Sequence, residues 1–309
     1  MTDDFTILAR GAFSLRESAE FGFGQRDRAV FDAKLRLAFV LDGYDTQVGA
    51  VVRQAGDTVH GEVHHPESRP GRIPVATVSA QVARMLSLDH DGTAFAEIGR
   101  RDPVIARLQA VAPGLRPPLF HSPYEAAAWS VLSARRPARQ MAAVRDRLSA
   151  EHGHRFRLAG RDVAAFPTPA QLLEVADVPG LPREHLSRLH GVARAALSGS
   201  LDVLRLQRMG PDAAVKTLRQ IRGIGPFYAG LITVRATGFA DVLPVDEPNL
   251  RARVGELYGF DGPVSGAELE RIAEAWRPLR TWAAVLIRAA AGRLSDQAAP
   301  AIPSTGGGA

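Results

Sequence analysis

The chain has 309 residues, enough to bury a large core and to divide into two or three domains. It contains no cysteine, which excludes thiolate zinc sites, iron–sulfur clusters, disulfides and cysteine nucleophiles. The net charge is +5, and nearly all basic residues are arginine, since only Lys34 and Lys216 are lysines. Arginine suits phosphate recognition, although a codon bias towards Arg, Ala and Gly explains the same excess.

The sequence gives no sign of a membrane span or a secretory signal. No uncharged apolar run reaches the roughly 18 residues that a spanning helix requires. The first residues, MTDDFTILAR, are acidic rather than basic. We therefore expect a cytosolic protein.

The best strand candidates lie in the first 75 residues. Residues 33–43 alternate and then run apolar, and residues 46–63 are typical of two short strands around a Gly-Asp turn. Residues 14–24 have a helical pattern, and residues 64–74, rich in Pro, Arg and Gly, predict a loop. The pattern predicts a small mixed antiparallel β/α domain over residues 1–75.

After residue 76 the helical period continues almost without interruption. Clear examples are residues 102–112, 123–134, 168–176 and 266–291. Asp102 and Thr168, each followed by proline, are good N-caps. We expect an all-α region over residues 76–296 and a disordered tail over residues 297–309.

Residues 213–238 predict a helix, a four- or five-residue hairpin around Gly223-Ile224-Gly225, and a second helix. Gly223 and Gly225 can adopt positive φ and leave the backbone uncovered. Successive N–H groups at the start of the second helix then form an anion site suited to a DNA phosphate. The carbonyls of Ile221 and Gly223 are candidates to hold a monovalent cation. A plain corner between two helices explains the same glycines.

A fainter version of this pattern occurs at residues 178–197, VPGLPREHLSRLHGVARAAL. A Pro-Gly turn again precedes a helical stretch. We interpret it as a degenerate copy of the hairpin.

An extended stretch, VLPV, leads from the second helix to Asp246, after which another helix begins. Asp246 is a good N-cap, with Glu247 and Pro248 in the first turn, and that structural role accounts for the residue. The functional interpretation is a carboxylate at the mouth of a cleft.

These segments resemble the helix-hairpin-helix (HhH-GPD) DNA glycosylases, and among them the bacterial 3-methyladenine DNA glycosylase II group. The resemblance rests on five pieces in the same order: residues 102–134, residues 166–176, IRGIGPFYAG (221–230), LPVDEPNLRARV (243–254) and AEAWRPLRTWAAVLI (273–287). It implies a mainly α fold with two helical lobes around a cleft, preceded by the small antiparallel β/α domain.

The resemblance implies that Asp246 is the catalytic carboxylate, with Glu247 as the alternative. A fixed carboxylate stabilises the positive charge that develops on the deoxyribose when an N-glycosidic bond breaks. Members that cut the strand use a lysine on the second helix of the hairpin, where this chain has Phe227. The implied enzyme is therefore monofunctional and leaves an abasic site, without a cofactor.

The implied pocket for the flipped base departs from the family pattern. Its residues are Phe227, Leu231 and Arg288, with Tyr228 and Trp282 as compensating members whose helical spacing suits core positions better. Leucine and arginine favour a cationic alkylated purine less than aromatic rings do. The pattern therefore leaves open a bulky, neutral or otherwise different lesion.

A second departure lies in the loop whose tip fills the gap left by the flipped base. Here the chain has Arg135, Arg136 and Pro137. Arginine can stack in the gap and bind phosphate, whereas a solvated basic turn is the alternative. The predicted DNA-binding residues are Arg222, Gly223, Ile224, Gly225, Phe227, Arg135 and Arg136.

The predicted partner is double-stranded DNA with a damaged base, bound by a monomer in the nucleoid. No side-chain metal site is predicted, because His60, His64 and His65 lack a carboxylate pattern. Two rivals remain open: a non-catalytic DNA-binding or damage-sensing protein on the same fold, and a helical interaction module that binds no nucleic acid.

Overall fold

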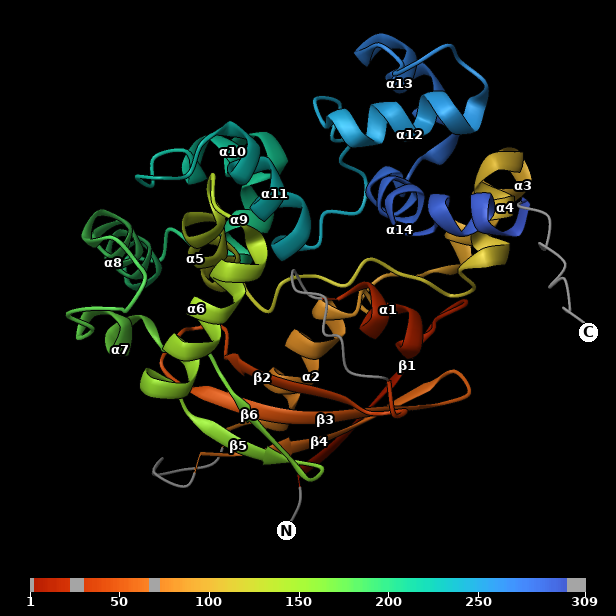
Figure 1. Ribbon diagram of the computed structural model, residues 1–309. Coiled ribbons are helices and arrows are strands. Elements are labelled where there is room, and N and C mark those ends of the chain that lie inside the picture. Colours follow the sequence, from red (N-terminus) through yellow and green to blue (C-terminus); the bar gives the residue numbers. More distant parts are fainter. Residues whose placement is uncertain (1–2, 23–30, 67–72, 299–309) are drawn as a thin grey trace, which may run out of the picture.

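The computed structural model describes residues 3–22, 31–66 and 73–298. Figure 1 shows a sheet layer with two groups of helices on one side of it. The tail predicted at 297–309 lies outside the described residues, apart from residues 297 and 298, which continue the last helix.

The sheet is antiparallel, with strand order β1-β4-β3-β2. Its strands are β1 (Asp3–Leu8), β2 (Leu35–Val40), β3 (Gln47–Ala55) and β4 (Thr58–His64). Ala55 pairs with Thr58 across the predicted Gly-Asp turn, in which Gly56 has φ +59°. Strand β1, which the sequence analysis did not predict, adds to β4 at one side of the sheet.

One face of the sheet packs against α1 (Leu15–Phe21) and α2 (Val75–Met85). Phe39, Val52 and Val59 of the sheet meet Val78 and Met85 of α2 in a single buried cluster. Gly61 permits this packing, because an added Cβ would lie 2.0 Å from the ring of Phe5. Apolar contacts of the sheet layer therefore extend into α2.

The other face is covered by a hairpin that the sequence analysis missed. Strands β5 (Arg155–Leu158) and β6 (Arg161–Ala164) pair with each other inside the region expected to be helical. Phe156 and Leu158 pack against Ala38 and Val51 of the sheet. This burial on both faces explains why β2 and β3 contain apolar runs instead of alternating apolar and polar residues.

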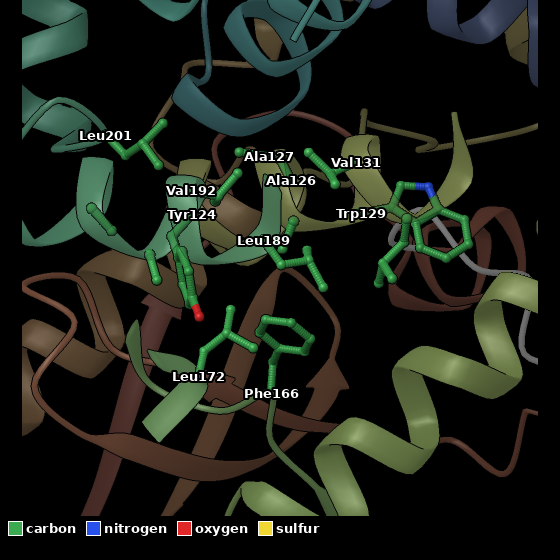
Figure 2. Close-up of a cluster of buried hydrophobic side chains, with 14 of the residues drawn as sticks. Tyr124, Ala126, Ala127, Trp129, Val131, Phe166, Leu172, Leu189, Val192 and Leu201 are labelled. Carbon is green, nitrogen blue, oxygen red and sulfur yellow. The ribbon is translucent and has the colours of Figure 1, made fainter. Parts of the chain in front are cut away.

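The first helical lobe is one buried cluster formed by the helices from α5 to α11 (Figure 2). Its helices are α5 (Pro123–Ser133), α6 (Ala138–His152), α7 (Pro169–Leu173), α8 (Arg183–Leu197), α9 (Val203–Met209), α10 (Pro211–Leu218) and α11 (Pro226–Thr237). Thr168 caps α7 in a capping box, as predicted.

The second lobe is assembled from two distant parts of the chain. Its elements are α3 (Thr93–Arg101), α4 (Pro103–Val111), α12 (Pro248–Tyr258), α13 (Gly266–Ala273), η1 (Glu274–Trp276) and α14 (Arg280–Ala298). Asp102 caps α4 as predicted, and its other carboxylate oxygen accepts from Tyr258 Oη at 2.5 Å and Trp276 Nε1 at 2.9 Å. The two-lobed helical fold after a β/α domain is confirmed, although Pro278 interrupts the helix expected over 266–291.

Buried polar contacts fix the first lobe on the sheet layer. Glu125 on α5 accepts from the N–H of Val40 at 3.0 Å, and Arg84 on α2 donates to the carbonyl of Ala236 at 2.8 Å. The Tyr44 hydroxyl donates to Leu201 O at 2.6 Å. Helices α5 and α11 are thereby fixed to the sheet and to α2.

Among the helices of the described segments, none has both the length and the apolar composition of a membrane span.

Candidate active site and DNA-binding surface

The predicted helix-hairpin-helix is formed by α10, a turn over residues 219–225, and α11. Ile224 N donates to Ile221 O at 3.0 Å, and both isoleucines are buried. Gly223 has φ +97°, in the region that favours glycine. Gly225 differs from the expectation: with φ −80° and ψ 178° it is extended and forms the N-cap of α11.

The first backbone N–H groups of α11 have no partners within the part of the chain that the structure describes. Gly225 offers no capping side chain, and Pro226 has no N–H. Ala229 N donates to Gly225 O at 2.9 Å, whereas the N–H groups of Phe227 and Tyr228 have no carbonyl partner among the described residues. Such a helix start favours an anion.

Gly225 allows a direct test of that anion site. Because an added Cβ at Gly225 would meet no atom within 4 Å, Gly225→Ala should cost at most about 1 kcal/mol of folding free energy. The methyl group would obstruct an approaching phosphate, so we expect roughly tenfold weaker binding to duplex DNA, about 1.4 kcal/mol. Fluorescence anisotropy measures the affinity. Gly191→Ala, an equally open helical position on α8, is the control, and equal affinity of the two variants would contradict the site.

The loop over residues 135–137, predicted to fill the gap left by the flipped base and called the wedge loop from here on, lies beside the hairpin. A Cβ built on Gly223 would be 3.5 Å from Val131 Cγ2 on α5, the helix that leads into this loop. Arg135 is exposed and has φ +55°, which is uncommon for a residue with a side chain. Arg136 is half-buried, and its charge acts on His185 of α8. The structure therefore brings the loop and the hairpin together.

Reversing the charge of Arg136 should separate a DNA-binding role from a structural one. Arg136 makes no ion pair within the described part of the chain, so Arg136→Glu should change the unfolding free energy by only about 0.5 kcal/mol. Binding to lesion-containing DNA should fall at least tenfold, because a cation next to phosphate becomes an anion. The exposed Arg107 on α4 provides the same charge reversal as a control. Equal losses of stability and binding would make Arg136 structural.

The structure corrects the prediction that Asp246 caps the helix after it. The N-cap of α12 is Glu247, whose carboxylate accepts from Asn249 N at 3.2 Å and Leu250 N at 2.7 Å. Glu247 is buried, whereas Asp246 is exposed. The Asp246 carboxylate makes no hydrogen bond or ion pair with any residue that the structure describes. It is therefore available to a ligand.

The segment before Asp246 is fixed to the start of α14. Thr281 N donates to Ala240 O at 2.9 Å, and Thr281 Oγ1 accepts from Val242 N at 3.0 Å. Arg280 Nε donates to Asp241 Oδ1 at 2.8 Å. Glu247 N then donates to Pro244 O at 3.1 Å, which closes a turn with Asp246 near its tip. The exposed Asp246 carboxylate therefore lies on a turn whose preceding segment is fixed to α14.

The residues predicted to line a base pocket have different environments. Phe227 is 61% exposed and contacts Tyr228 edge-on, with ring centroids 5.3 Å apart. Leu231 is half-buried and Arg288 is exposed. The structure corrects the placement of Trp282 in the pocket. Its side chain is buried between Phe95, His90 and Arg116 and belongs to the core of the second lobe.

Arg235 was missed by the sequence analysis, and its position one helical turn after Leu231 was the available signal. Its guanidinium lies 5.1 Å from the Phe21 ring centroid and donates to Pro118 O at 2.6 Å. Burial, and secondarily the nearby charge of Arg288, lowers the pKa of Arg235 to about 10. Its Nε is buried without a hydrogen-bond partner among the described residues. Two cations thus lie close together beyond Leu231.

Two histidines at the end of β4 and just after it have carboxylate neighbours that the sequence did not indicate. His65 Nε2 lies 2.7 Å from Asp3, and His64 Nε2 lies 3.2 Å from Glu62. Within the described segments, no three potential ligands gather as a metal site would need. At the hairpin, Ile221 O accepts from Ile224 N, and the cation at the carbonyls of Ile221 and Gly223 stays a prediction.

Comparison with known proteins gives several relatives, although no family model matches the chain. The DNA-3-methyladenine glycosylase of Bacillus subtilis is 25% identical over 204 residues, which cover 63% of this chain and 66% of that protein. The DNA-3-methyladenine glycosylase 2 of Escherichia coli is 29% identical over 199 residues, which cover 63% of this chain and 67% of that protein. The matches thus span about two thirds of these relatives.

The fold matches solved structures over nearly its whole length. The 3-methyladenine DNA-glycosylase of Archaeoglobus fulgidus has a TM-score of 0.75 at 20% identity, covering 94% of this chain and 99% of that one. The 8-oxoguanine glycosylase/lyase of Clostridium acetobutylicum, in complex with double-stranded DNA, has a TM-score of 0.64 at 16% identity, covering 96% and 98%. The chain therefore has the helix-hairpin-helix DNA glycosylase fold and resembles the DNA-3-methyladenine glycosylases in sequence.

Proposed function

We propose that the protein is a base-excision-repair DNA glycosylase that hydrolyses the N-glycosidic bond of a flipped, damaged base, most simply an alkylated one. The observation that carries the proposal is the exposed Asp246 carboxylate, which has no partner among the described residues and lies on a turn fixed to α14, in a chain whose hairpin helix has no capping side chain. The relatives named DNA-3-methyladenine glycosylases support an enzyme over the non-catalytic alternative.

In this proposal Asp246 stabilises positive charge on the deoxyribose as the bond to the base breaks. The carboxylate also orients the attacking water on the opposite face of the sugar. The base must first leave the helical stack, which costs a few kcal/mol and least for a damaged base. The hairpin N–H groups and the wedge loop would hold the distorted strand meanwhile.

The reaction would stop at the abasic site. A strand-cutting glycosylase needs an amine near the sugar, and α11 contains no lysine. Lys216 lies on α10, before the hairpin. Borohydride should therefore trap no covalent adduct with lesion DNA, and strand breaks should appear only after alkali or heat treatment.

The lesion itself should carry little positive charge. Arg235 and Arg288 have no carboxylate partner among the described residues, and a cationic base bound near them would be repelled. We expect neutral alkylated purines to be released faster than N3-methyladenine.

The experiment that tests the function is incubation with randomly methylated double-stranded DNA, followed by mass spectrometry of the released bases. Free methylated base is the expected product. Tight, salt-dependent DNA binding with no released base would instead support the non-catalytic damage sensor. If the protein neither binds DNA nor releases a base, the result would support the helical interaction module.

A further inference from the structure

The start of α8 lies against the hairpin. Gly180, at φ +84°, precedes α8 in a turn in which Leu181 N donates to Val178 O at 2.9 Å, as Ile224 N does to Ile221 O before α11. One turn into α8, Arg188 approaches the hairpin, because its Cδ lies 3.2 Å from a Cβ built on Gly223.

Three segments far apart in sequence bring charge to this place. Glu184 on α8 lies 2.6 Å from Arg188 and 3.9 Å from Arg222 of the hairpin. His185, half-buried, experiences the charges of Arg136 from the wedge loop, and of Arg188 and Glu184 from its own helix. The cluster thus contains one carboxylate and three guanidinium groups, those of Arg136, Arg188 and Arg222, so it has a positive excess.

The cluster also contains unsatisfied polar atoms. Arg188 Nε and His185 Nδ1 are buried, and neither has a hydrogen-bond partner among the described residues. Buried polar groups without partners are uncommon, and each costs folding free energy. These two atoms are closed to a ligand, but both side chains are partly exposed, and their other nitrogens can meet a ligand with acceptor oxygens and negative charge.

We propose that His185 and Arg188 form a further contact to the DNA backbone, between the contacts of the wedge loop and those of the hairpin. We also propose that His185 takes up a proton when a phosphate binds. This inference rests on the proposed function only in taking duplex DNA as the ligand. Neither residue lies in the segments that the sequence analysis assigned to DNA.

The direction of the proton linkage follows from the charges around the imidazole. Burial first, then Arg136 and Arg188, lower the pKa of His185 below its ordinary value of 6.5, against the opposing effect of Glu184. An arriving phosphate favours the imidazolium and raises this pKa in the complex. The complex then binds more protons than the free protein. The affinity for DNA therefore increases as the pH falls. The whole gain in affinity is present below the pKa of His185 in the free protein, and it is lost above the pKa of His185 in the complex.

The test measures binding of the full-length protein to a duplex with a tetrahydrofuran abasic analogue, from about pH 5.5 to 8.5, around the ordinary histidine pKa. The wild-type dissociation constant should fall about three- to tenfold towards low pH. His185→Gln should lose that change, and His185→Lys should bind tightly with little pH dependence. Unchanged pH dependence in both variants would overturn the proposal.

Salt dependence tests Arg188 separately. Arg188→Gln should reduce the slope of log affinity against log salt by about one phosphate contact. Arg194→Gln is the matched control, because Arg194 is exposed on the same helix and nine residues, about half a rotation, beyond His185. Equal slopes for the two variants would count against the contact.

The outcomes separate this inference from the proposed function. Proton-linked DNA binding without released base would keep the contact and reject the glycosylase. Release of base, together with a pH dependence of binding that persists in His185→Gln, would support the glycosylase and reject the contact. Absence of DNA binding would reject both.

Discussion

Asp246→Asn is expected to abolish base release while leaving the fold and DNA binding intact. The amide keeps the shape of the side chain but loses the charge that stabilises the sugar cation, so the excision rate should fall by about 10³-fold or more. Asp246 is exposed and unpaired among the described residues, so the unfolding free energy should change by no more than about 0.5 kcal/mol. Single-turnover release of base from methylated DNA measures the effect. DNA affinity should stay equal or increase, because an anion next to phosphate is removed.

Glu247→Gln is the matched control for this result. Glu247 caps α12 through two backbone hydrogen bonds, so its loss of charge should cost up to about 1 kcal/mol of stability and little activity. The reverse pattern, in which Asp246→Asn remains active and Glu247→Gln does not, would move the catalytic role to Glu247. It would also reject the site as described.

The largest effect on stability is expected at Arg116. This side chain is fully buried and donates to five backbone carbonyls: those of Arg10, Gly11, Ala12, Ser87 and His90. Its guanidinium also lies 5.4 Å from the Trp282 ring centroid and 5.7 Å from that of Phe13. It thus joins the sheet layer to the second lobe. Arg116→Met would remove all of these hydrogen bonds, although Arg10 O would keep the one that it accepts from Gly92 N, and we expect a loss of about 4 kcal/mol.

Urea denaturation followed by circular dichroism measures this loss. Arg107→Met, an exposed position on α4, should change stability by no more than about 0.5 kcal/mol. The loss of stability in Arg116→Lys should lie between those of the two variants, since an ammonium group keeps the charge but has only three donors. A loss below about 1 kcal/mol for Arg116→Met would show that water replaces the guanidinium.

Local chemistry made several parts of this structure predictable. The turn at Gly223 needs only a residue that accepts positive φ, and Pro226 sets the start of α11. Asp102 and Thr168 cap helices through hydrogen bonds within three residues. Turns and caps depend on neighbours in sequence, so the helix-hairpin-helix and most helix starts could be predicted from the sequence.

Other features depend on contacts that are remote in sequence. The hairpin at 155–164 forms where the sheet offers Ala38 and Val51 as a surface to cover, whereas its two buried residues, Phe156 and Leu158, are too few to show a strand period. Trp282 has the spacing of a pocket or a core residue, and Phe95 and Arg116 place it in the core.

The amino-acid sequence by itself determined the helical fold class, the glycine hairpin and the presence of two neighbouring carboxylates after it. Which carboxylate caps α12 and which faces solvent was decided only by the tertiary structure. Either acid suits an N-cap, and the choice depends on how Thr281 and Arg280, more than thirty residues later, hold the chain as it enters the helix. Those contacts bury Glu247 as the cap and leave Asp246 exposed.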